Sequence, residues 1–141
     1  MKVKDIMTSP VIHISPGESV EVAARTLAHY NIGILPVCTG NGTLCGMVTD
    51  RDLVTRCLAA NRSPAKTTVR EVMTNSVLSV KPDTDTGVAA HLMGRQQVRR
   101  LPVVEDGKLC GMVALGDLAV REESVMDAAD ALMDISSNIR G

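Results

Sequence analysis

The chain has 141 residues, a formal net charge of −1 at pH 7 and an aromatic content of only 1%. Its length allows a buried core, whereas the balanced charge and the scarcity of aromatic side chains argue against a nucleic-acid partner. The N-terminus lacks the long apolar stretch of a signal peptide, and no apolar run approaches the length of a membrane span. We therefore expect a cytoplasmic protein with no membrane partner.

The sequence shows no pattern of catalytic or metal-binding residues. Its four cysteines include no C-x-x-C pair, and its three histidines do not cluster near any cysteine pair. Cys45 and Cys110 each precede Gly-Met-Val, in a predicted buried strand where a free thiol packs as a small hydrophobe. We interpret the cysteines as core residues rather than as disulfides or metal ligands, and we expect neither a metal site nor enzymatic activity.

The sequence consists of two copies of one unit. Val3–Thr8 returns as Val69–Thr74, 66 positions later. Further along, Leu44–Val48 returns as Leu109–Val113, 65 positions later. The missing residue falls in a predicted turn, where changes of length are tolerated, so the chain is an internal duplication.

Each copy predicts the order β-α-β-β-α. Apolar residues at i, i+3, i+4 and i+7 indicate an amphipathic helix after the first strand, and Asn41-Gly42 or Asp106-Gly107 indicates a tight turn between the next two strands. In the first copy the expected elements are strand Val11–Ile14, a helix that buries Val20, Ala23, Ala24 and Leu27, strands Ile34–Cys38 and Leu44–Val48, and a helix from Asp50 to Ala60 that buries Leu53, Val54 and Cys57. In the second copy the first strand is Val77–Val80, and the helix that follows buries Ala89, Ala90 and Met93.

These elements predict a mixed fold, α+β (α/β-type), with four segments. We expect the first repeat at 1–60, a linker at 61–68, the second repeat at 69–121 and a C-terminal amphipathic helix at 122–141. A unit of about 60 residues buries little surface alone, so the repeats are expected to pack sheet to sheet about a pseudo-twofold axis. Such packing leaves two related clefts, and ligand sites favour such places. The C-terminal helix would pack on the pair or on a second subunit.

Two such units, each with Leu-Pro-Val, an apolar-Gly-Met-Val strand and an Asp-Leu helix start, resemble the CBS-domain pair, or Bateman module. The chain is similar to short stand-alone bacterial proteins of this family. The resemblance implies regulatory binding of an adenosine-containing ligand (AMP, ADP or ATP) in a cleft between the repeats, with no cofactor required. It also implies a homodimer, and a further protein partner is left open.

The family's nucleotide motif matches the first copy in full. Gly33–Pro36 supplies the Gly-x-x-Pro strand, and Thr49 and Asp52 supply the Thr-x-x-Asp sequence. A carboxylate can accept hydrogen bonds from both ribose hydroxyls, although Thr-x-x-Asp at a helix start is also an acidic capping box. We expect Thr49 and Asp52 to do both. The adenine would lie between aliphatic side chains, for which the candidates are Val11, Ile12, Ile34 and Pro36 of the motif strand, and Val77.

The second copy departs from this motif. Ala114 replaces the threonine and Asp117 keeps the acid, so we expect a weakened second site there. Only the second copy carries two arginines before its Leu-Pro, Arg99 and Arg100. By the resemblance they would reach the phosphates of a ligand held by Thr49 and Asp52, and arginine suits that task because its planar fork pairs with phosphate oxygens. Successive strand residues point to opposite faces, so one of the two arginines would enter the cleft.

Two other functions stay open at this stage. The chain would be a dimeric scaffold or interaction protein if its clefts are empty. It would be a sensor of S-adenosylmethionine or NAD if the adenosine belongs to one of those molecules.

Overall fold

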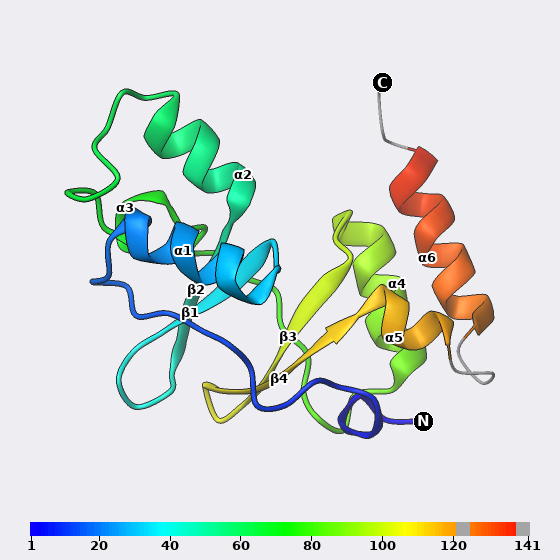
Figure 1. The fold of residues 1–141 in the computed structure, drawn as a ribbon. Helices are drawn as coiled ribbons and strands as arrows, with labels where there is room; N and C mark the ends of the chain where they lie inside the picture. Colours follow the sequence, from blue (N-terminus) through cyan, green and yellow to red (C-terminus); the bar gives the residue numbers. More distant parts are fainter. Residues whose placement is uncertain (121–124, 138–141) are drawn as a thin grey trace. The chain divides into compact units, whose positions relative to one another are not determined.

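A computed structural model describes residues 1–120 and 125–137, and it confirms the mixed fold of helices and short strands. The chain divides into two compact units (Figure 1). Unit 2 is the continuous segment Ile12–Val77, and unit 1 combines Met1–Val11 with the chain from Leu78 onward. Each unit contains its own two-stranded antiparallel sheet and its own apolar core.

Unit 2 holds the hairpin of the first copy and the helices around it. Its elements are α1 (Val20–Tyr30), β1 (Ile34–Cys38), β2 (Leu44–Thr49), α2 (Asp50–Leu53), the π-helical turn η2 (Val54–Leu58) and α3 (Val69–Val72). Ser19 caps the start of α1, because its hydroxyl accepts a hydrogen bond from the N–H of Val22 at 3.1 Å.

Unit 1 repeats this arrangement and adds one helix. Its elements are the 3₁₀ turn η1 (Val3–Asp5), α4 (Thr86–Gln96), β3 (Arg100–Glu105), β4 (Lys108–Ala114), α5 (Leu115–Ala119) and α6 (Val125–Ser137). The turn between β3 and β4 is the predicted tight one: Asp106 and Gly107 both have positive φ, at 53° and 80°.

The first strand predicted for each copy is shorter than expected. Ile14 and Val80 each form a single parallel bridge, to Val37 and Val103, and residues 11–14 and 77–80 form no named strand. The Ile14 N–H donates to the carbonyl of Pro36, but the next ladder bond would need an N–H from Pro36 itself. Because proline has none, the parallel ladder stops after one bridge, and Pro102 has the same effect in unit 1.

The repeated segments at the start of each copy are exchanged between the units. Val3 and Ile6 belong to the core of unit 1, with the second copy, whereas Val69 and Val72 belong to the core of unit 2, with the first copy. Backbone hydrogen bonds fix both exchanges, since Thr8 and Met112 bond to each other through N–H and carbonyl, as do Thr74 and Met47. The first segment of each copy therefore completes the core that is built around the other copy.

Helix α6 gives unit 1 a packing surface that unit 2 does not have. It packs on α4 and α5 (Figure 1), and it places Ala128, Ala131 and Ile135 in the core of unit 1. The predicted helical spacing in the tail is thereby confirmed over Val125–Ser137, while the start at residue 122 lies outside the described residues.

The effect of α6 is visible when the copies are compared. Ala90 on α4 is 1% exposed, whereas its counterpart Ala24 on α1 is exposed, contrary to the predicted apolar face. Val54 was expected to point inward and is 53% exposed, while Leu53 and Cys57 are buried as predicted. The helices of unit 2 therefore bury fewer apolar side chains than the sequence predicts.

The described residues include no helix that is both long and apolar enough to cross a membrane. All four cysteines are free thiols, with Cys38 and Cys57 buried and Cys45 and Cys110 half-buried. The interpretation of the cysteines as core residues is confirmed for Cys38 and Cys57.

Candidate functional site

The Thr-x-x-Asp sequence of the first copy lies where β2 passes into α2. The Thr49 hydroxyl accepts from the N–H of Asp52 at 3.1 Å, and the Thr49 N–H donates to Asp52 Oδ2 at 2.9 Å. These two bonds form a reciprocal capping box. The capping role expected of both residues is thus confirmed, and the box fixes the orientation of the carboxylate.

A neighbouring arginine holds the same carboxylate from the other side. Arg56 Nε lies 3.8 Å from Asp52 Oδ1, and its Nη1 donates to the carbonyl of Val72 at 3.0 Å. The Asp52 side chain is 14% exposed, so it is accessible from one direction only. A carboxylate held in this way keeps acceptor capacity for a ligand without needing to reorient.

The strand β1 presents the other half of the motif beside this loop. Ile34 is the register partner of Thr49, and the Gly33 carbonyl accepts from the N–H of Asp50 at 3.0 Å. A Cβ on Gly33 would lie 3.4 Å from Asp50 Oδ2, so the glycine leaves room for this acidic side chain. The motif of the first copy therefore forms a compact acidic corner of Asp50 and Asp52.

The remaining candidates of the first copy are spread over two units. Ile34 is half-buried and Pro36 is buried in β1, while Ile12 is 37% exposed at the start of unit 2. Val11 belongs to unit 1 and Val77 to unit 2. Their joint contact with an adenine remains a prediction.

The corresponding corner of the second copy has the same backbone and different chemistry. Ala114 has φ −114° and ψ 153°, close to the φ −115° and ψ 164° of Thr49, and its N–H donates to Asp117 Oδ2 at 2.9 Å. The second bond of the box is missing because alanine has no hydroxyl. Arg100 is the register partner of Ala114, and the Arg99 carbonyl accepts from the N–H of Leu115 at 2.8 Å.

Arg99 and Arg100 therefore stand where the first copy has Gly33 and Ile34, and Leu115 stands where it has Asp50. The corner changes from acidic in unit 2 to predominantly basic in unit 1. The predicted reach of the two arginines to a ligand on Thr49 and Asp52 remains a prediction.

A pocket of about 670 Å³ opens at this basic corner, within unit 1. Its wall combines the four residues predicted for the second copy with the start of α5 and one side of α6: Arg99, Arg100, Ala114, Leu115, Gly116, Asp117, Ala119, Val125, Ala128, Ala129 and Leu132. The structure thus brings Arg99, Arg100, Ala114 and Asp117 together.

The contribution of α6 to this pocket was missed by the sequence reasoning. The sequence predicted an amphipathic C-terminal helix, but it did not show where that helix would dock. A usable signal was the contrast between the copies at Gly87 and Gly94, which replace Glu21 and Ala28 of the first copy and admit a helix closely.

Among the residues that the structure describes, no group of three or more histidine, cysteine, aspartate or glutamate side chains could hold a metal ion. The polar groups available at both corners are carboxylates, guanidinium groups and one threonine hydroxyl. These groups suit a polar organic ligand. A duplicated unit of helix and hairpin with such a corner in each copy defines a class of two-repeat proteins.

Comparison with known proteins identifies this class. The family model for the CBS domain matches twice, at residues 3–59 and 69–124. The chain therefore belongs to the CBS domain family and carries a pair of these domains, as the sequence predicted. It is 42% identical over 134 residues to the CBS domain-containing protein YhcV of Bacillus subtilis, which covers 95% of this chain and 94% of that protein.

Two solved structures extend the comparison. Hypoxic Response Protein I, solved with two coordinated zinc ions, has a TM-score of 0.79 and 33% identity, covering 84% of this chain and 97% of the other. Its curated counterpart, Hypoxic response protein 1, is from Mycobacterium tuberculosis. The CBS domain pair of protein MJ0100, solved with 5-methylthioadenosine and S-adenosyl-L-methionine, has a TM-score of 0.74 and 32% identity, covering 84% and 93%.

Proposed function

We propose that this CBS pair is a cytoplasmic regulatory module without catalytic activity, and that it binds an adenosine-containing ligand at the Thr49–Asp52 corner. AMP, ADP and ATP are the ligands we favour. The observation that carries the proposal is the reciprocal capping box, which holds the Asp52 carboxylate in one orientation at a half-buried position.

The chemistry of the corner suits a ribose. The two vicinal hydroxyls of a ribose can both donate to one carboxylate, and each charge-assisted bond contributes about 1.5–3 kcal/mol. The box holds Asp52 in place before the ligand arrives, so little side-chain entropy is lost on binding. The related pair of MJ0100 was solved with two adenosine derivatives, which supports the same ligand class here.

The phosphate contacts belong to the proposal as well. We assign them to Arg99 or Arg100, since guanidinium groups pair bidentately with phosphate oxygens. The Asp50 and Asp52 carboxylates would repel a phosphate at their own corner, and Arg56 is already paired with Asp52, so we assign the phosphate to arginines of the second copy. The second-copy corner is proposed as the weaker adenosine site, because Ala114 lacks the hydroxyl of Thr49.

Calorimetric titration with AMP, ADP, ATP and S-adenosylmethionine tests this function. Asp52→Ala and Arg100→Ala are each expected to weaken adenosine-ligand binding at least tenfold, about 1.4 kcal/mol. Asp117→Ala is the matched control, since it removes the same side chain from the other corner and is expected to change the affinity little. Loss of binding with Asp117→Ala and not with Asp52→Ala would reverse the assignment.

A scaffold function is the second candidate, favoured by the missing hydroxyl at Ala114. In that case the chain would act as a homodimer or with another protein, and its corners would stay empty. Thermal unfolding distinguishes the two: a ligand at 100 times its Kd adds about 2.7 kcal/mol of stability. No shift with any adenosine ligand at millimolar concentration would favour the scaffold.

A further inference from the structure

The pocket of unit 1 is lined mainly by apolar side chains. Apart from Arg99, Arg100 and Asp117, its lining side chains are alanine, leucine or valine, with one glycine. The Asp117 carboxylate accepts one hydrogen bond, from the Ala114 N–H. An apolar ligand body suits this lining, because each buried polar group without a partner costs about 1–3 kcal/mol.

The two arginines give one end of the pocket a positive charge. Among the described residues, neither the Arg99 nor the Arg100 side chain takes part in a hydrogen bond or an ion pair. Other arginines of the chain are engaged, for example Arg62 with Glu71 and Arg25 with Glu21. Two arginines at this end, beside one engaged carboxylate, favour an anionic group there.

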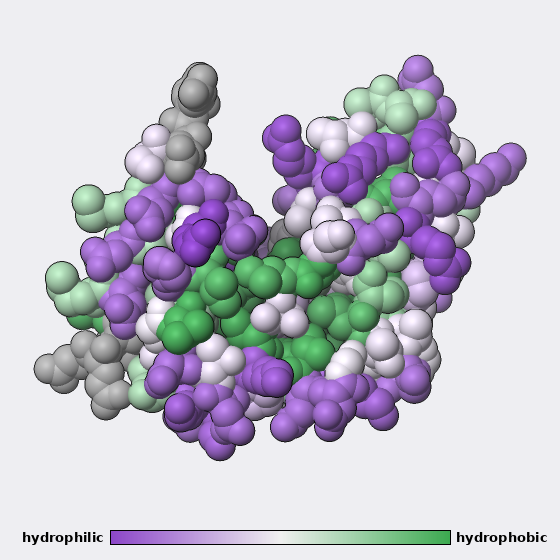
Figure 2. Space-filling view, turned by 180° about the vertical axis from the view of Figure 1, so that it is seen from behind, coloured by the Kyte–Doolittle hydropathy of each residue, from purple (hydrophilic) through white to green (hydrophobic). Residues whose placement is uncertain are grey.

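Helix α6 gives the other side of the pocket an apolar wall. Val125 and Leu132 line it and are still 44% and 42% exposed, so they present apolar surface to the opening. Ala129 lies between them, one helical turn from Val125. Figure 2 shows, on one face of the molecule, apolar groups of unit 1 set among hydrophilic ones. Outside the pocket lining, α6 also exposes Met126 and Met133, at 71% and 69%.

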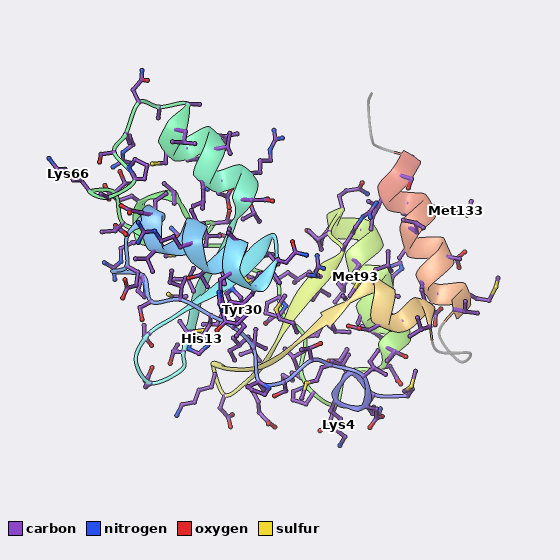
Figure 3. The ribbon with its side chains drawn as sticks, viewed as in Figure 1. Lys4, His13, Tyr30, Lys66, Met93 and Met133 are labelled. Carbon is purple, nitrogen blue, oxygen red and sulfur yellow. The ribbon has the colours of Figure 1, made fainter. Side chains whose placement is uncertain are left out.

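The wall is held in place by close packing on α4. A Cβ on Gly94 would lie 3.3 Å from the Ala131 Cα, and the Gln97 side-chain amide donates to the Asp134 carbonyl at 3.3 Å. Figure 3 shows Met133 on the side of α6 that is turned away from α4, where it is 69% exposed. The pocket therefore exists only while α6 is docked.

We propose that this pocket binds an amphiphilic anion, a small molecule with a phosphate or carboxylate group and an apolar body. The anionic group contacts Arg99 and Arg100, and the apolar body lies against Val125, Ala129 and Leu132 of α6. A volume of about 670 Å³ is within the range of small-molecule sites. This site goes beyond the proposed adenosine function, with which it shares the two arginines and the corner of Ala114 and Asp117.

Isothermal titration calorimetry with octanoate, octyl phosphate and 1-octanol tests the proposal on the full chain. The two anions are expected to bind, and the comparison between them identifies the preferred head group. The neutral alcohol is expected to bind at least tenfold more weakly. Equal binding of 1-octanol, or no binding of either anion at millimolar concentration, would overturn the proposal.

Substitutions locate the site. Leu132→Ser and Arg100→Gln are each expected to weaken octanoate binding at least tenfold, while Met133→Ser and Arg95→Gln, their matched controls outside the pocket, leave it unchanged. Should Leu132→Ser unfold α6, Ala129→Glu keeps helix propensity and repels the anion. Wild-type octanoate affinity in both α6 variants, or loss of affinity in Met133→Ser, would refute the site.

The adenosine proposal and the proposal for this pocket can be refuted independently of each other. Asp52→Ala is expected to weaken AMP and to leave octanoate unchanged, and Leu132→Ser is expected to do the opposite. Weaker AMP binding in Leu132→Ser, with no octanoate binding to the wild-type chain, would show that the pocket takes a nucleotide and would overturn the ligand class.

Discussion

Ala114→Thr is expected to stabilise the protein, because it restores the missing half of a capping box. Ala114 and Thr49 differ by only 1° in φ and 11° in ψ, by the values −114° and 153° against −115° and 164°. Ala114 also borders the pocket, so the added atoms have space. The new hydroxyl would accept from the N–H of Asp117, as the Thr49 hydroxyl accepts from that of Asp52 at 3.1 Å.

The expected gain is about 1 kcal/mol, since replacing an N-cap threonine by alanine costs about 0.5–2 kcal/mol. In a chain of this size that gain raises the Tm by roughly 3 °C. Urea denaturation and calorimetry measure it, with Thr49→Ala expected to lose a similar amount. Ala24→Thr, at an exposed position of α1, is the matched control and should destabilise slightly through helix propensity. If Thr49→Ala destabilises while Ala114→Thr does not stabilise, equal backbone angles do not make equal caps, and the reasoning fails.

Three further predictions concern the core and the loops. Gly94→Leu is expected to displace α6 and to cost about 1–3 kcal/mol in urea denaturation, because the nearest atoms include the Ala131 backbone at 3.3 Å; an unchanged stability would contradict this packing. Burial raises the pKa of the Cys38 thiol to about 11, so iodoacetamide at pH 8 is expected to leave Cys38 unmodified in the folded protein and to modify it in urea. Hydrogen bonds from the Thr68 backbone N–H and hydroxyl lower the pKa of Glu71 below its ordinary 4.5, so the stability lost in Glu71→Ala should be full above that pH and should fade as the pH falls through the lowered pKa; a pH-independent loss in denaturation experiments would refute it.

The sequence was sufficient for the duplication, the hairpins and the capping boxes, because each depends on local chemistry. The turn at Asp106-Gly107 depends only on the positive φ angles of these two residues. The capping box of Thr49 and Asp52 depends only on the start of a helix. The offset of 66 residues is visible without any structure. These features were predicted because neighbours in sequence decide them.

Features that depend on distant partners were not predictable in the same way. The exposure of Ala24 and the burial of Ala90 follow from the docking of α6 on one copy only, and the glycines at 87 and 94 were the sequence difference that indicated this docking. The single bridge at Ile14 depends on Pro36 lying opposite it, more than 20 positions away. The pocket beside Arg99 needs α6 as its wall, so no motif could reveal it.

The exchange of the first segments limits how the chain can be divided and how it can be synthesised. Residues 12–77 form one uninterrupted unit, so a fragment with these ends would keep the core cluster of this unit together. A fragment cut at the repeat boundary would lack Val69 and Val72, which close the core around the first copy. On the ribosome, Val3 and Ile6 emerge before residues 12–77, and their core exists only after residues beyond Leu78 have followed. Unit 1 is therefore completed after unit 2.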